Sequence, residues 1–409
     1  MKDGYLIDTQ APGVYRPVDS GAGVPFAKFY KPDPLPPEIE LSKDVTQAYG
    51  RAMHALGRLD GFWSEIEAPK TVFGLFVYKE AEQSSQVEGT RVTVSDMYVE
   101  GEDSKDVREA RNYASALKDT AKQLSETGRS RENLSLDLIR SLHSEVMEQG
   151  RRGDEDPLPG EFRPDYAWIE EATSGYGTQI RFVPPKAEIA RSRMENFEEY
   201  LQARGEYPDL IDIGILHYQI ETIHPFVDGN GRVGRLLIVL LLMAEDVLLH
   251  PLFYLSSYIR RNREEYTELL LAVNEEGAWN EWLEFFLTGL KTQADEAFTR
   301  AKLLLQLRNR YETRYADGPP SVQRLTEVIF TEPVFTINRA AELIDMTYPA
   351  AHSAIRTLEE DGVLRERTGK ERYQEFQADE VLDALNDDAE DIPSPESFME
   401  ADDARFEDW

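Results

Sequence analysis

The chain has 409 residues, of which 41% are hydrophobic and 10% aromatic, and its formal net charge is −32. This length allows two or three domains with their own cores, and no apolar run reaches the roughly 18 residues of a membrane span. The absence of cysteine excludes disulfides and thiolate metal sites. Together with an N-terminus that lacks an apolar signal segment, it favours a cytoplasmic protein.

The large negative charge has two interpretations. One is an acidic surface suited to high salt, where screening removes the self-repulsion of the folded chain. The other is an acidic protein that binds basic partners. The acidic residues are spread along the whole chain rather than gathered in blocks, which favours a halophilic protein. In such a protein, the lack of a basic patch is no argument against nucleic-acid binding.

The first forty residues are rich in Pro and Gly and end in KPDPLPPEIE. Proline excludes a regular helix or a central strand, so we expect an extended arm that lies on the rest of the protein. From Leu41 the pattern becomes helical. Ser42 is a suitable N-cap for a helix that runs to about Leu59.

A second helix is predicted from Pro69 to Glu88, and Gly89 stops it. Ser84 and Glu88 are four residues apart, so they share one face of this helix. A glutamate in the last turn lies at the unfavourable end of the helix dipole. It is therefore either an ordinary exposed residue or one whose partner comes from elsewhere in the chain.

The middle of the chain is predicted to be almost entirely helical. A β-hairpin is expected where residues 166–169 and 179–183 flank the turn-rich segment EATSGYG. The expected helices cover residues 107–128, 134–149, 186–204, 208–223, 254–273 and 278–313.

The most informative stretch is HPFVDGNGRVGR, residues 224–235, which is followed by the apolar run Leu236 to Met243. The apolar run predicts a buried helix, and the glycine-rich segment opens it. A helix N-terminus presents free N–H groups and the positive end of the dipole, which favours phosphate. Asp228 is suited to a hard cation and His224 to proton transfer. The stretch thus predicts a phosphate site.

Residues 317–320 indicate a linker to a different kind of unit. Helices are expected at 322–330, 337–344 and 349–360, the last capped by Thr347, and two strands are expected around Thr368 and Gly369. A helix–turn–helix followed by a hairpin is a winged-helix pattern. The tail from Asn386 is acidic and is expected to be disordered.

The stretch from His224 to Arg235 matches the HPFxDGNGRxxR signature of the Fic family at every position, and the chain resembles that family. SSQVEG, residues 84–89, resembles the family's inhibitory motif [ST]xxxE[GN]. PGEFR (159–163), RFVPP (181–185) and YLSSYIRRNREEY (254–266) resemble stretches of Fic proteins with a C-terminal winged helix. The resemblance covers roughly residues 20–380 and implies a mainly α fold: a Fic-type helical core with a small hairpin flap, plus the winged helix.

The resemblance implies transfer of a nucleoside monophosphate, usually AMP from ATP, to a Ser, Thr or Tyr hydroxyl of a protein target, the protein itself included. His224 would be the general base and Asp228 would hold Mg²⁺. The residues that would bind the nucleotide are Gly229, Asn230, Gly231, Arg232, Gly234 and Arg235, with Tyr266 and Asn274 at the adenine. Glu88 would pair with Arg235 to exclude the γ-phosphate, Ser84 would anchor the helix, and the hairpin would clamp the target.

We therefore expect an N-terminal arm and inhibitory region at 1–105, a catalytic core at 106–313, a winged helix at 318–380 and a tail at 386–409. Arg356, Arg365, Arg367, Lys370 and Arg372 could meet DNA phosphates, although acidic neighbours make a dimerisation or target-docking role equally suitable. A DNA-bound regulator that only senses nucleotide, another nucleotide specificity, and removal of AMP stay open as alternatives, as does a homodimer.

Overall fold

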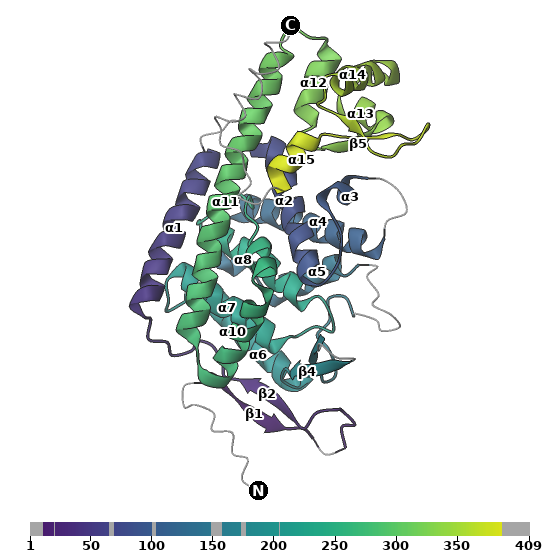
Figure 1. Cartoon of the computed structure of the whole chain (residues 1–409). Helices are drawn as coiled ribbons and strands as arrows, with labels where there is room; N and C mark the ends of the chain where they lie inside the picture. Colours follow the sequence, from purple (N-terminus) through teal and green to yellow (C-terminus); the bar gives the residue numbers. More distant parts are fainter. Residues whose placement is uncertain are drawn as a thin grey trace.

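The structure is a computed structural model that describes residues 11–19, 21–64, 69–99, 104–148, 158–172, 177–203 and 205–386. The predicted mainly α fold is confirmed. A long helix, α11 (Trp279–Arg314), runs through most of the molecule, and α1 (Lys43–Ser64) lies along it (Figure 1). None of the described helices is long and apolar enough to cross a membrane. The expected tail beyond Asn386 lies outside the described residues.

Two adjacent helices form the centre of the core. These are α7 (Asp209–Ile223) and α8 (Asn230–Ala244), which are apolar on almost every side and therefore almost completely buried. The helices around them are α4 (Lys105–Thr127), the short 3₁₀ helix η1 (Arg131–Asn133), α5 (Leu136–Val146) and α6 (Ala187–Gln202). The short connection between α7 and α8 carries the His224 stretch, so this stretch is fixed on both sides by the core.

The N-terminal arm contains a hairpin that the sequence did not predict. Strand β1 (Gly13–Pro17) pairs antiparallel with β2 (Lys28–Pro32). The arm does lie on the core, because the Tyr30 N–H donates to the carbonyl of Val183 at 2.8 Å. Ser42 caps α1 as expected: its Oγ accepts from the N–H of Val45 at 3.1 Å.

Helix α2 (Pro69–Val87) ends where the sequence predicted, because Gly89 has a φ of +90° that stops the helix. A further short helix, α3 (Val94–Tyr98), was not predicted. Thr93 starts it with a capping box: its side chain accepts from the Asp96 N–H, and the Asp96 carboxylate accepts from the Thr93 N–H at 3.0 Å.

Two predictions need correction in the rest of the core. The flap consists of antiparallel strands β3 (Ile169–Ala172) and β4 (Thr178–Phe182), so its first strand begins at the residue where we expected it to end. The single helix predicted at 254–273 is two helices, α9 (Ser256–Arg261) and α10 (Arg263–Glu276). The break falls at Asn262, whose Nδ2 donates to the carbonyl of Tyr258 at 2.9 Å.

The C-terminal unit has its elements in the order expected of a winged helix, with strand order β5-β7-β6 in its sheet. Thr347 precedes α14, but its side chain makes no capping hydrogen bond, contrary to our prediction. The elements are α12 (Pro320–Val328), β5 (Val334–Thr336), α13 (Ile337–Leu343), α14 (Tyr348–Glu360), β6 (Arg365–Glu366), β7 (Glu375–Gln377) and α15 (Asp379–Asn386), the last unpredicted.

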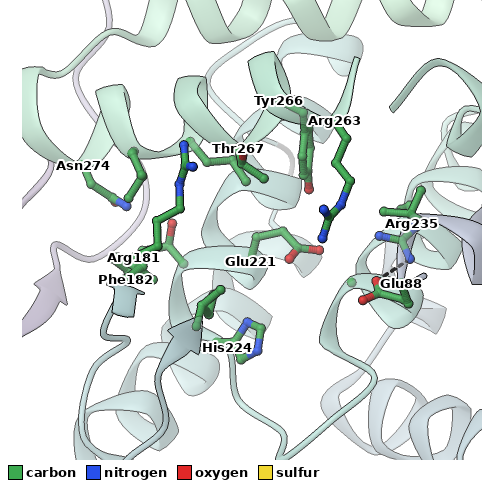
Figure 2. A pocket seen from close by; sticks show the side chains of 16 residues that line it. Glu88, Arg181, Phe182, Glu221, His224, Arg235, Arg263, Tyr266, Thr267 and Asn274 are labelled. Carbon is green, nitrogen blue, oxygen red and sulfur yellow. Dashed lines mark hydrogen bonds and ion pairs between the residues drawn. The ribbon is translucent and has the colours of Figure 1, made fainter. Parts of the chain in front are cut away.

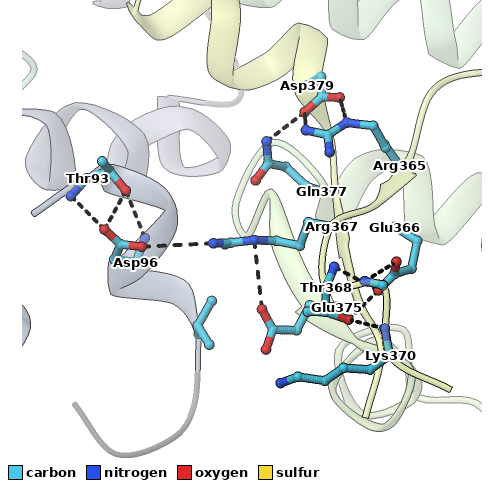
Figure 3. Close-up of polar contacts among 12 residues, drawn as sticks. Thr93, Asp96, Arg365, Glu366, Arg367, Thr368, Lys370, Glu375, Gln377 and Asp379 are labelled. Atoms are coloured by element: carbon cyan, nitrogen blue, oxygen red, sulfur yellow. Dashed lines mark hydrogen bonds and ion pairs between the residues drawn. The ribbon is translucent and has the colours of Figure 1, made fainter. Parts of the chain in front are cut away.

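This unit touches the segment that contains α2 and α3. Figure 3 shows Arg367 between two carboxylates, with Asp96 of α3 and Glu375 of its own sheet each at 3.9 Å. The ammonium group of Lys79, on α2, donates to Asn386 Oδ1 of α15 at 2.8 Å. The C-terminal unit therefore packs against the helix that carries Ser84 and leads into Glu88.

Candidate functional site

His224 lies at the C-terminal end of α7 in a left-handed conformation with φ +50°. Arg163 holds this turn from the loop before the flap. Its Nε donates to the carbonyl of His224 at 2.8 Å, and its backbone N–H donates to the carbonyl of Pro225 at 2.9 Å. The imidazole is therefore fixed through its own backbone, and its ring lines a pocket between α7, α8 and α10.

Two buried side chains stabilise the turn between His224 and α8. The Asn230 amide accepts from the Phe226 N–H at 2.8 Å and donates to the Phe226 carbonyl at 3.0 Å. The ring of Phe226 stacks on His143 at a centroid distance of 3.8 Å. His143 Nδ1 accepts from the N–H of Gly160 at 2.9 Å, so its Nε2 carries the proton and donates to the carbonyl of Asp228 at 2.9 Å. The side chain of Asn230 thus shapes the turn and does not line the pocket.

The first turn of α8 has the open backbone that the predicted anion site requires. Gly229 has a φ of +78°, and a Cβ there would lie 2.8 Å from the sulfur of Met147, so only glycine fits. Helix α8 then begins at Asn230. The N–H groups of its first turn have no carbonyl partner within the helix, and they are available to an anion. Gly231 lines the pocket at this point.

Arg235 is bound by the end of α2. Its Nη2 donates to Glu88 Oε1 at 2.7 Å and to the Ser84 carbonyl at 2.9 Å, while its Nε donates to Ser84 Oγ at 3.0 Å. Figure 2 shows the contact with Glu88 on one side of the pocket. The side chain of Arg235 is 2% exposed and that of Glu88 is 39% exposed. The two residues and Ser84 lie as the resemblance implied.

Arg232 faces another direction. Its Nη1 donates to Glu109 Oε2 of α4 at 2.5 Å, and its Nη2 lies 3.6 Å from Asp228 Oδ1. Both partners of the Arg232–Glu109 pair are nearly buried. Arg232 and Asp228 are thus brought together, but neither lines the pocket that contains His224 and Arg235. In this state the two motif arginines do not converge on one ligand.

The pocket has a volume of about 180 Å³. Tyr266 and Asn274, predicted from loose spacing, both line it, and each is tied to α7. The Tyr266 hydroxyl is hydrogen-bonded to His217 Nε2 at 2.9 Å, and Asn274 Oδ1 accepts from the hydroxyl of Tyr218 at 2.5 Å. Gly234, also predicted to bind nucleotide, lies inside α8 and does not line this pocket.

Glu221 lines the pocket and was missed by the sequence reasoning. It lies one helical turn before His224, and this spacing could have revealed it. Glu109 was also missed. Its partner Arg232 is 123 residues away, so no local pattern connects the two.

Burial and neighbouring charges set the ionisation of the site. Burial, with a contribution from Arg163, lowers the pKa of His224 to about 4, so its imidazole is neutral at pH 7. Burial also raises the pKa of Glu221 to about 7. For Glu88, burial acts in the same direction, but the charge and hydrogen bond of Arg235 outweigh it and bring the pKa below its usual value. Glu88 is therefore ionised at neutral pH.

The site offers few protein ligands for a metal ion. Among the described residues, no group of three or more His, Asp or Glu side chains is placed to hold one. Asp228 contributes a carboxylate that accepts from the Gly229 N–H at 2.7 Å. One carboxylate together with phosphate oxygens is a set that suits Mg²⁺, which usually keeps several waters.

The cations of the C-terminal unit are mostly paired. Arg356 lies 2.5 Å from Glu359, Arg365 lies 2.5 Å from Asp379, and Arg367 contacts Asp96 and Glu375. Lys370 and Arg372 are exposed, and no ion pair within the described ranges involves them. Only part of the predicted DNA-contact set is therefore available without breaking an existing pair.

Comparison with known proteins agrees with this geometry. The Fic/DOC family model matches residues 133–242, and the Fic/DOC family N-terminal model matches residues 46–122. The chain resembles the uridine 5′-monophosphate transferase of Xanthomonas campestris (32% identity over 108 residues) and the protein adenylyltransferase Fic of Drosophila mojavensis (30% over 148 residues). These matches cover 25% and 35% of this chain, and only 20% and 27% of the respective relatives.

A solved structure extends the likeness in fold. A Fic family protein from Desulfovibrio desulfuricans superposes with a TM-score of 0.53 at 19% identity, covering 84% of this chain and 98% of that one. The family models and the aligned relatives confirm the resemblance carried by the His224 motif. The chain belongs to the Fic/DOC family.

Proposed function

We propose that this protein is a self-inhibited nucleotidyltransferase that moves AMP from ATP to a Ser, Thr or Tyr hydroxyl of a protein target, itself included. The observation that carries the proposal is one pocket that holds a half-buried, neutral imidazole, the open first turn of α8 and the Arg235–Glu88 pair. A relative named protein adenylyltransferase supports the same reaction class.

In this reaction His224 takes the proton of the target hydroxyl as its oxygen attacks the α-phosphorus. A new oxygen–phosphorus bond forms, the bond to the bridging oxygen breaks, and pyrophosphate leaves with the electron pair. The N–H groups of Asn230 and Gly231 stabilise the charge on the α-phosphate, and that of Gly229 would join them once it leaves the Asp228 carboxylate to which it now donates. Asp228 would hold Mg²⁺, which supplies charge neutralisation on the phosphates. A neutral imidazole at pH 7 is in the correct state for this role.

Inhibition follows from competition for Arg235. A γ-phosphate and the Glu88 carboxylate are both anions that suit the same guanidinium. While Glu88 is bound, ATP cannot place its γ-phosphate there and lies in a non-productive pose. Ser84 would hold the same arginine from the preceding turn. The flap β3–β4 would clamp the target by strand addition, because Ile169 and Phe182 line the pocket rim.

The transferred group is tested directly by mass spectrometry. The Glu88→Gly protein is incubated with Mg²⁺ and ATP, UTP, GTP or CTP in turn, and the added mass is read. We expect an added AMP group with ATP, and no addition in Glu88→Gly/His224→Ala. A relative named for uridine monophosphate transfer makes an added UMP group the main rival outcome. No addition with any nucleotide would contradict the proposal, and loss of AMP from a modified protein would point to the reverse activity.

A second candidate is a DNA-bound regulator whose nucleotide site only senses ligand. The exposed Lys370 and Arg372 favour it, while the internal pairs of Arg356, Arg365 and Arg367 count against it. A protein that only senses nucleotide does not need a general base. If this candidate is correct, the His224→Ala variant would therefore keep the full cellular effect of the parent protein.

We further propose the division into residues 1–105, 106–313 and 318–380. The absence of cysteine supports a cytoplasmic location.

A further inference from the structure

The pocket beside His224 has an ordered sequence of chemical groups along its length. Figure 2 shows Arg235 and Glu88 at one end, Asn274 and Phe182 at the other, and Glu221 between them. The first end carries charges suited to phosphate. The second end holds the ring of Phe182 beside the polar side chains of Arg181 and Asn274 (Figure 2), and Leu270 and Leu271 are among the apolar residues that line the pocket, a combination suited to a planar base. A nucleotide with its phosphates at the first end and its base at the second would have its sugar at the middle position.

Glu221 supplies an unused hydrogen-bond acceptor at this middle position. Its Oε1 is buried and has no hydrogen-bond partner in the described part of the chain. Of the nearby donors, Arg235 donates to Ser84 and Glu88, and the hydroxyl of Tyr266 is bonded to His217. The guanidinium of Arg263 also points toward Glu221 (Figure 2), but it makes no hydrogen bond to Glu221 Oε1. A buried carboxylate oxygen without a partner is costly, so Glu221 Oε1 points to a donor on the ligand.

The missing side chain of Gly234 leaves space for the Glu221 carboxylate. Gly234 lies in α8 opposite Glu221, and a Cβ at that position would lie 2.6 Å from Glu221 Oε1. Any larger residue at 234 would push the carboxylate out of its place. The role of Gly234 is therefore to admit Glu221, rather than to touch the phosphates itself.

We propose that Glu221 accepts a hydrogen bond from a ribose hydroxyl and makes the site selective for ribonucleotides over deoxyribonucleotides. The inference rests on the proposed function, because it assumes that a nucleotide lies along the pocket with its phosphates at Arg235. A carboxylate repels phosphate oxygens, so Glu221 must face a neutral, donor-bearing part of the ligand. Ribose hydroxyls are the donors next to the phosphates. A site built to bond a hydroxyl rejects the analogue that lacks it.

The test is calorimetric titration of the full chain carrying Glu88→Gly with ATP, 2′-deoxy-ATP and 3′-deoxy-ATP in the presence of Mg²⁺. We expect ATP to bind about ten- to hundredfold more tightly than at least one deoxy analogue, the range for a hydrogen bond to a charged group. Adding Glu221→Ala brings the ratio close to one by weakening ATP alone. Glu221→Gln keeps a neutral acceptor and falls between. The matched control is Glu268→Gln, on the exposed face of α10, which leaves the ratio unchanged.

The affinity for the deoxy analogue serves as the folding control, since a misfolded variant loses all three ligands. Equal weakening of every nucleotide in Glu221→Ala would overturn the inference and assign Glu221 to positioning of Arg235. An unchanged ratio would overturn it as well. If the Glu88→Gly chain binds no nucleotide at all, the proposed function itself fails, and the two failures are thereby distinguished.

Discussion

At the scale of single residues, Arg235 is the group through which the end of α2 contacts the site. Its guanidinium is buried and makes three hydrogen bonds, two to Ser84 of α2 and one to Glu88, the residue that follows α2. Arg235 therefore connects the end of α2 to the first turns of α8. Each substitution at this contact should change both stability and the access of nucleotide.

Ser84→Ala removes one of these acceptors and leaves the others. We expect the free energy of unfolding to fall by about 1–2 kcal/mol, because a buried donor loses its partner. Auto-modification should rise, but less than in Glu88→Gly. The neighbouring Ser85→Ala is the matched control: Ser85 is buried as well, but its hydroxyl has no partner within the described residues, so its loss should be close to neutral. Urea unfolding of both variants measures the difference, and equal losses would contradict the account.

Glu80 gives a pH-dependent test of how α2 is anchored. It accepts hydrogen bonds from the hydroxyl of Tyr113 at 2.9 Å and from the N–H and hydroxyl of Ser256, and burial raises its pKa from 4.5 to about 7. A folded pKa above the unfolded pKa means that the folded state holds more protons between these values. The contribution of Glu80 to stability is therefore full below pH 4.5 and is lost as the pH rises through 7.

Glu80→Gln removes this dependence. Relative to the parent protein, the variant should gain about 3 kcal/mol of unfolding free energy between pH 5 and pH 8, an order-of-magnitude value from the shift in pKa. Chemical unfolding of both proteins at several pH values measures this difference. A difference that stays constant with pH would show that folding does not raise the pKa of Glu80.

At the scale of elements, the end of α2 decides where Glu88 lies. Gly89 has a φ of +90° and open space around its Cα, so Gly89→Ala meets backbone strain without a steric clash. We expect a loss of about 1 kcal/mol in unfolding free energy. Gly57→Ala is the control with the opposite expected sign. Gly57 is exposed in the middle of α1 and has equally open space, so the substitution should raise the unfolding free energy by about 0.5–1 kcal/mol. Equal effects of the two substitutions would contradict the assigned role of Gly89.

Elements with a strong local signal were predictable from the sequence. Helix α8 follows from the apolar run after the motif, and α2 follows from its periodicity and from Gly89. Helix α3 and the β1–β2 hairpin were missed, because five residues each give too little periodicity for a prediction. The break between α9 and α10 was missed because Asn262 is not a typical helix breaker.

The site was predictable where one continuous motif carries it. The signature placed His224 and the first turn of α8, and the inhibitory motif placed Glu88 beside Arg235. The second arginine pair was not predictable, because Glu109 and Arg232 meet only through the packing of α4 on α8. The two hydrogen bonds between the Asn230 side chain and the Phe226 backbone were not predictable either, because the motif does not show which of its side chains point into the protein.

At the scale of the whole molecule, the net charge of −32 remains the dominant property. A surface with this charge repels itself in dilute buffer, and salt relieves the repulsion. We expect the melting temperature to rise by several degrees or more when KCl is increased from 0.05 M to 1 M, where the screening length falls to about 3 Å. Differential scanning calorimetry measures this. A melting temperature that is flat or falls over this range would remove the support for a halophilic protein.

The central claim is that Glu88, directly after α2, withholds Arg235 from ATP and thereby keeps the His224 site inactive. The most direct measurement is the rate at which the protein labels itself with ATP labelled at the α-phosphate, compared among the parent chain, Glu88→Gly and Glu88→Gly/His224→Ala. We predict at least about a tenfold increase for Glu88→Gly, the effect of one charged hydrogen bond, and no labelling in the double variant. Equal labelling of the parent chain and Glu88→Gly would contradict the account.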